Sequence, residues 1–167
     1  MATVLYLSKP VTARPHASPG RLRNYRPDVG DETAWLQLRS RAIEASGLIP
    51  RNSRAWTERD FQREFLNQPW WLPARMWFTL SSTSDEPTGS VALMIRHART
   101  DSATGHLHWL IVDPDHQRQG IGRILLHAAI ERCVLEGLTE LNVETLSSWR
   151  SAVSFYRQHG FKPRAPS

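Results

Sequence analysis

The chain has 167 residues, of which 40% are hydrophobic and seven are tryptophan, and this fits one globular domain with a packed core. Its single cysteine, Cys133, excludes an internal disulfide and favours the reducing cytoplasm; we expect Cys133 to be a small core residue. The net charge of +5 attracts anions. Because no long basic run, nucleic-acid motif or membrane-length apolar stretch occurs, we expect no specific nucleic acid and no membrane as partners, and a small phosphorylated ligand instead.

Residues 1–20 differ in composition from the rest of the chain. The first acidic residue is Asp28, and basic and hydroxyl residues precede it, as in an organellar transit peptide. No clear amphipathic helix occurs there, so the sequence favours a flexible segment, although the run Val4–Leu7 is also compatible with a strand added to a sheet edge. We therefore divide the chain into this segment and one domain, 21–167.

Hydrophobic periodicity and turn residues predict alternating strands and helices along the domain. The predicted strands are 21–27, 75–82, 90–98, 106–114 and 138–146, with a last extended piece from Phe161. The predicted helices are 30–45, 57–67, 120–137 and 149–160. This order indicates an α/β fold with a mixed sheet and helices on both faces.

Several residues mark where these elements begin and end. Thr57 and Asp60 have the spacing of a capping box, and Gly137 is placed to end the longest helix. Ser147 or Ser148 is expected to cap the last helix. The polar stretch 82–89, which contains proline and glycine, is expected to be the turn of a β-hairpin.

The stretch HQRQGIGRIL, residues 116–125, places two glycines between a predicted strand and a predicted helix. Glycine allows a tight turn and the close approach of a ligand, and a helix N-terminus binds anions. The dinucleotide motif GxGxxG would require glycine where Leu125 stands, and the Gly-Lys-Ser/Thr of a phosphate P-loop is absent. The glycine turn by itself is compatible with two interpretations: a phosphate-binding site, or the start of a helix without a ligand.

Two motifs resemble the GNAT superfamily of N-acetyltransferases. Residues 117–122 match its Q/R-x-x-G-x-G/A motif, which here follows Val-Asp-Pro, and 151–161 match its closing A-x-x-x-Y-x-x-x-GF signature. The order of elements over roughly residues 21–163 is also that of the family. The resemblance implies transfer of an acetyl group from acetyl-CoA to a primary amine, on a small molecule or a peptide, by direct attack in a ternary complex.

The resemblance also implies where acetyl-CoA binds. Backbone groups of the strand before the turn would hold the pantetheine arm, and amides of the turn would hold the pyrophosphate. The corresponding residues are Leu110, Ile111 and Val112 for the arm, and Gln117, Arg118, Gln119, Gly120, Ile121, Gly122 and Arg123 for the motif and its amides. A side chain at either glycine would then intrude on the phosphates.

Candidate catalytic residues follow from the same resemblance. Tyr156 matches the tyrosine that protonates the leaving thiolate, although a packed aromatic would also fit that position. His106 and His108, on one face of a strand, and Glu144, near the end of the next, are candidates for the general base. Each can equally be an ordinary strand residue. An H-x-H metal pair lacks an evident third ligand, so we expect no metal.

The acceptor pocket is expected between the first two helices and the start of the last. Trp149 replaces an asparagine common in the family and, with Trp56 and Phe61, is a candidate to line this pocket. Trp70 and Trp71 are further aromatics in this region, and Asp60 and Glu64 are candidates to pair with a cationic acceptor. For each of these residues, core packing or a solvated helix face is the alternative.

The sequence ends six residues after Phe161, before the family's usual C-terminal hairpin. Either the segment Val4–Leu7 or a second subunit, in a homodimer, would complete that wall. The shortened C-terminal end and Trp149 are also compatible with an alternative function, that of a non-catalytic module that binds acyl-CoA.

Overall fold

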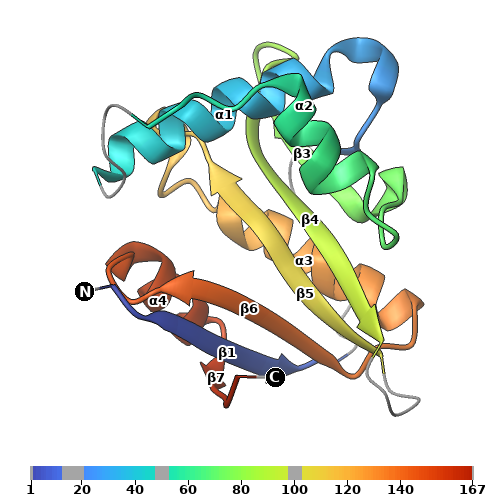
Figure 1. Cartoon of the computed structure of the whole chain (residues 1–167), viewed down its shortest axis with the longest axis vertical. Helices are drawn as coiled ribbons and strands as arrows, with labels where there is room; N and C mark the ends of the chain where they lie inside the picture. The colour runs from blue at the N-terminus through green and yellow to red at the C-terminus, as the bar shows by residue number, and fades with distance from the viewer. Residues whose placement is uncertain (1, 13–20, 48–52, 98–102, 167) are drawn as a thin grey trace.

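The computed structural model describes residues 2–12, 21–47, 53–97 and 103–166. These residues form a seven-stranded mixed sheet in the order β2-β3-β4-β5-β6-β1-β7, with helices packed against it (Figure 1). The strands are β1 (Val4–Pro10), β2 (Arg21–Asn24), β3 (Met76–Leu80), β4 (Pro87–His97), β5 (Ala103–Val112), β6 (Glu140–Leu146) and β7 (Lys162–Pro163). The α-helices are α1 (Asp31–Ser46), α2 (Glu58–Phe61), α3 (Ile121–Leu135) and α4 (Arg150–Gln158). The expected α/β class with a mixed sheet is confirmed.

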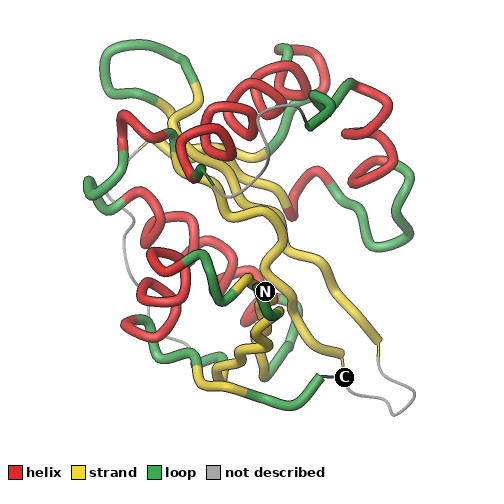
Figure 2. Tube along the Cα trace, turned by 60° about the vertical axis from the view of Figure 1, so that its left-hand side comes forward, coloured by secondary structure: helices red, strands yellow, loops and turns green. Residues whose placement is uncertain are grey.

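Alternating side chains of the sheet pack into two hydrophobic clusters. Met76 and Phe78 of β3 belong to the cluster with the buried side chains of α1 and α2, whereas Trp77 between them belongs to the cluster with α3. Successive side chains of a strand point to opposite faces, so both faces of the sheet are covered. Figure 2 shows the strands between helices on two sides. None of the described helices is long and apolar enough to cross a membrane.

Strands β5 and β6 pair in parallel over a short stretch and then separate (Figure 1). Their register joins Gly105–Leu107 to Leu141–Val143, and both strands continue beyond it. β5 also bends away from β4 at a β-bulge, because Ser90 pairs with Ile111 but Ala92 pairs with His108. Trp109, inside the bulge, has a positive φ of 51°. The bulge redirects the second half of β5 and helps to open the sheet.

The N-terminal residues Val4–Pro10, for which the sequence favours a flexible segment, form strand β1. This strand runs antiparallel to β6 from Val4 opposite Leu146 to Pro10 opposite Glu140. It lies inside the sheet, because the two-residue β7 pairs with its other edge. Leu7 at its centre is 1% exposed. Burial of this apolar side chain and the ladder along β6 explain the strand, while the boundary at residue 20 and the transit-peptide hypothesis stay predictions.

Two element ends differ from the sequence prediction. Pro87 and Gly89 belong to β4 and not to the preceding turn, because they pair with Leu80 and Thr79 of β3. Glycine is required at position 89 by packing, since a Cβ there would lie 2.8 Å from Ile121 of α3. The cap of α4 is Trp149 without a side-chain bond, whereas Ser147 Oγ accepts the N–H of Thr3 at 3.0 Å.

The expected capping box at the start of α2 is confirmed: the Thr57 N–H donates to the Asp60 carboxylate at 2.7 Å. α2 continues as a π-helical turn, Gln62–Leu66. The short 3₁₀ turns are Pro27–Val29, Pro73–Arg75 and Pro114–His116.

Candidate functional site

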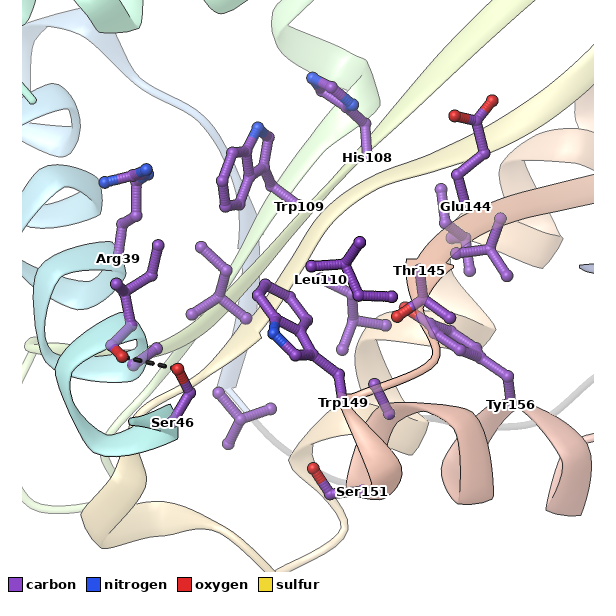
Figure 3. A pocket seen from close by; sticks show the side chains of 18 of the residues that line it. Arg39, Ser46, His108, Trp109, Leu110, Glu144, Thr145, Trp149, Ser151 and Tyr156 are labelled. Carbon is purple, nitrogen blue, oxygen red and sulfur yellow. Dashed lines mark hydrogen bonds between the residues drawn. The ribbon is translucent and has the colours of Figure 1, made fainter. Parts of the chain in front are cut away.

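A cavity of about 820 Å³ occupies the opening between β5 and β6. Its walls come from the second half of β5, the ends of α1 and β6, and the first turns of α4 (Figure 3). Leu110, Ile111, Val112 and Gln117 all line it. The strand residues expected to hold a pantetheine arm therefore face a space that can contain one.

The glycine turn lies at one end of this cavity, between β5 and α3. Gly120, the N-cap of α3, has a φ of 81°, and Arg118 also has a positive φ, of 62°. The Ile124 N–H bonds back to the Gly120 carbonyl, so the N–H groups of the first helical turn before it point outward without helical partners. Together with the helix dipole they suit an anion.

Gly122 has a packing role that the sequence does not reveal. A Cβ there would lie 3.2 Å from the Phe155 ring of α4, so glycine allows α3 and α4 to approach. For Gly120, whose added Cβ would meet only the Arg123 side chain at 3.9 Å, the positive φ is the structural requirement.

Tyr156 projects from α4 toward the cavity, which it lines (Figure 3). The residue is 6% exposed, and burial raises the pKa of its phenol. Desolvation disfavours the phenolate, so Tyr156 holds its proton at neutral pH. A protonated hydroxyl at this wall is what a general acid requires.

His106 and Glu144 also line the cavity, but neither has the surroundings of an efficient base. Burial, reinforced by the positive charge of Arg96, lowers the pKa of His106 to about 4. Its Nε2 lies 3.1 Å from the Thr104 hydroxyl. Glu144 is exposed and faces Arg96 at 3.7 Å. A histidine with so low a pKa is a weak acceptor for an ammonium proton.

His108 has a different environment at the far end of the cavity from the glycine turn. Its Nε2 lies 2.8 Å from Glu64 Oε1, and the Trp109 indole N–H donates to the same oxygen at 2.9 Å. These hydrogen bonds lower the pKa of Glu64 and keep it ionised. His108 and Glu64 both line the cavity. The carboxylate holds the imidazole ring in a fixed orientation at the cavity wall.

The acceptor candidates separate into cavity and core residues. Trp149 lines the cavity, but Phe61 does not: it is fully buried against Trp35 and Phe65 in the core, so its assignment to the pocket is wrong. Trp56 is also outside the lining and stacks beneath Arg39.

The two acidic residues considered as partners of a cationic acceptor, Asp60 and Glu64, also differ in whether they line the cavity. Asp60 caps its helix and pairs with Arg54 and Arg63, so it is not free for an acceptor. Glu64 does line the cavity, bound to His108. The contact between Glu64 and His108, and the place of Arg39, have no signal in the sequence, because they depend on how α1, α2 and β5 pack together.

Comparison with known proteins places the chain in a family. Residues 45–161 match the acetyltransferase (GNAT) family. The mycothiol acetyltransferase of Beutenbergia cavernae is 28% identical over 153 residues, which are 92% of this chain and 48% of that protein. The [ribosomal protein bS18]-alanine N-acetyltransferase of Salmonella typhimurium is 33% identical over 106 residues, 64% of each chain. The chain thus spans about half the length of the mycothiol acetyltransferases that it matches.

The fold of solved acetyltransferases is similar as well. A chain of the NatC complex bound to Gag peptide and CoA matches with a TM-score of 0.64 and 19% identity, over 87% of each chain. At this identity the similarity concerns the fold. The chain belongs to the GNAT family of acetyltransferases, as the glycine turn and the tyrosine motif had indicated.

Proposed function

We propose that this protein transfers an acetyl group from acetyl-CoA to a primary amine, in a ternary complex and without an acyl-enzyme. The observation that carries this proposal is one cavity with a protonated tyrosine on one wall and a carboxylate-bound histidine on another. GNAT acetyltransferases use acetyl-CoA, and a pantetheine arm fits along the separated half of β5. The single cysteine leads us to place the activity in the cytoplasm.

The glycine turn would bind the pyrophosphate. Unpaired N–H groups at the start of α3 supply donors, and the exposed side chains of Arg118 and Arg123 add positive charge beside them. The thioester would then lie deeper in the cavity. A backbone N–H near Val112 would stabilise the oxyanion that develops on its carbonyl.

His108 would act as the general base, positioned by Glu64. It accepts a proton from the incoming ammonium, directly or through water, and the neutral amine attacks the thioester carbonyl carbon. We prefer it to His106 because its ring is half-buried beside a carboxylate, whereas His106 is buried near Arg96. A His108→Gln variant should lose activity at neutral pH, where the amine is protonated and a base is needed, and should recover toward the wild-type rate at alkaline pH, where the amine is already neutral; full activity at neutral pH would exclude this role.

Tyr156 would complete the transfer. As the C–S bond breaks and the amide forms, the phenol donates its proton to the CoA sulfur, and bulk solvent restores that proton. A buried thiolate is costly, as the pKa of Cys133, which burial raises to about 12, illustrates in this chain. A proton donor at the leaving sulfur therefore lowers the barrier.

The direct test is release of CoA thiol from acetyl-CoA in the presence of a panel of amines. The panel contains polyamines, aminoglycosides, amino acids, lysine peptides and peptides with a free N-terminal alanine. Release that depends on an acceptor supports the proposed function. Binding of acetyl-CoA without release to any acceptor would contradict it and favour a non-catalytic acyl-CoA-binding module.

A further inference from the structure

Arg39 of α1 is held in a fixed position at the acceptor end of the cavity. Its guanidinium carbon lies 3.8 Å from the centre of the Trp56 ring and 4.9 Å from that of Trp109. Such stacking holds the planar group in place while its N–H edges stay available. Arg39 lines the cavity, and its buried Nε has no hydrogen-bond partner in the described part of the chain.

The nearby carboxylates already have other partners. Glu64 accepts hydrogen bonds from Trp109 and His108 through one oxygen, and Glu144 faces Arg96. Within the described ranges, Arg39 forms no direct salt bridge, and the charges of Glu64 and Asp60 act on it only at longer range. The charged side chains that line the cavity are Arg39, Arg96, Arg150, Glu64 and Glu144. Arginines thus outnumber carboxylates, which disfavours a polycationic acceptor.

A second unpaired donor lines the same cavity from the opposite side. The Trp149 indole N–H, at the start of α4, is buried and has no partner among the described residues. In Figure 3 the indole lies beside Leu110 with its nitrogen on the side of α1. Buried donors without partners cost free energy, and two of them on one cavity indicate a ligand rich in hydrogen-bond acceptors.

The arginine and the proposed base flank one side chain. Arg39 stacks on the Trp109 indole, and the His108 ring centre lies 6.4 Å from it (Figure 3). A single small molecule can therefore reach both groups. Resting on the proposed function, we propose that the acceptor is a small zwitterionic amine, whose carboxylate binds Arg39 while its amine lies at His108.

The test compares acceptors that differ only in charge. A series of amino acids with increasing distance between amine and carboxylate is measured beside the corresponding carboxamides, with spermidine, an aminoglycoside and an alanine-terminated peptide in the same panel. Carboxamides of short amino acids have the more easily deprotonated amine, so intrinsic reactivity favours them. We expect the opposite order: at least one carboxylate exceeds its carboxamide in kcat/KM by about tenfold or more.

Substitutions assign that preference to Arg39. Arg39→Gln should remove the preference, through a higher KM for the carboxylate and little change for the carboxamide. Arg39→Lys should keep part of it, because the charge remains without the planar fork. Arg59→Gln is the matched control, since Arg59 is exposed on α2 and does not line the cavity. The affinity for acetyl-CoA and the melting temperature show whether each variant is folded.

The outcomes separate this inference from the function on which it rests. Carboxamides accepted as well as carboxylates, transfer only to spermidine, the aminoglycoside or the peptide, or a preference unchanged in Arg39→Gln, would each overturn the zwitterionic acceptor while leaving an acetyltransferase. Bound acetyl-CoA with no transfer to any member would instead overturn the proposed function.

Discussion

Tyr156 and His106 show how burial sets protonation states in this cavity. Both residues are at least nine-tenths buried, and in both cases burial favours the neutral form. For the tyrosine this keeps a proton available for transfer. For the histidine it removes the basicity that would be needed to take a proton from an ammonium. The same physical effect thus suits one residue to catalysis and the other to structure.

Replacing Tyr156 by phenylalanine should slow transfer without weakening the binding of acetyl-CoA. Loss of a general acid typically costs about 100-fold in kcat, whereas the ring that packs against Phe155 and Phe161 is retained. Steady-state CoA release and calorimetric titration with acetyl-CoA measure the two effects. Tyr6→Phe, on β1 and outside the cavity, is the control. An unchanged kcat in Tyr156→Phe would remove the general-acid role.

His106 should make the fold sensitive to acid. Its folded pKa of about 4 lies below the ordinary histidine value of 6.5, so the unfolded chain binds more protons between these values, and stability falls as pH decreases from about 6.5 to about 4. We expect a loss of about 1–2 kcal/mol after allowing for solvent screening. Urea unfolding at several pH values measures it. His106→Gln should flatten this dependence relative to the exposed control His97→Gln; parallel curves for both variants would contradict the assignment.

At the scale of elements, the glycine turn has a packing role and is also the proposed binding site of the pyrophosphate. Gly122 lets α3 approach Phe155 of α4, and Gly120 supplies the positive φ from which α3 begins. The turn therefore joins β5, which lines the cavity, to α3, which packs against α4. A charged substitution at Gly122 adds both a side chain that alters helix packing and a negative charge. A test of anion binding must therefore distinguish the effect of the charge from the effect of the packing.

Gly122→Asp should abolish binding of acetyl-CoA, through both bulk and repulsion of the phosphates. Phe155→Ala gives the added side chain room, since the Phe155 ring is the nearest group to a Cβ at this position. The double variant should fold as Phe155→Ala alone does and still fail to bind, because the charge remains. Calorimetric titration measures binding and thermal unfolding measures the fold. Normal affinity in the double variant would show that the pyrophosphate does not lie at this turn.

At the scale of the whole molecule, the N-terminal strand completes the half of the sheet that carries β6. β1 separates β6 from β7, and Val4 at its start lines the cavity. The N-terminal segment, rather than a second subunit, therefore covers β6 in this structure, while a homodimer stays a prediction.

Leu7→Ala should lower the free energy of unfolding by about 2–4 kcal/mol, as expected for a large side chain removed from a core. Leu7 is 1% exposed, whereas Val4 on the same strand is 42% exposed. Val4→Ala is therefore the control and should cost less than about 1 kcal/mol. Urea unfolding followed by tryptophan fluorescence measures both. Equal, small effects would mean that β1 is not a stable part of the sheet in solution.

Local patterns determined most of the elements. The amphipathic helices, the alternating strands, the capping box at Thr57 and the glycine motifs depend on residues close together in the chain, whose preferences act before the fold forms. These signals were sufficient for the α/β class, the family and the strand expected to carry the pantetheine arm. They were insufficient for β1, whose apolar run Val4–Leu7 gains a partner only when β6 has formed.

The sequence by itself thus determined the family and the position of the glycine turn proposed to bind the cofactor, because both rest on short motifs with their own local geometry. Only the tertiary structure decided which candidates share the cavity. It buried Phe61 in the core, lowered the pKa of His106, and brought Glu64 and Arg39 into contact with Trp109. Burial, pKa and contact between distant residues arise from packing around the bulge of β5, which no local pattern encodes.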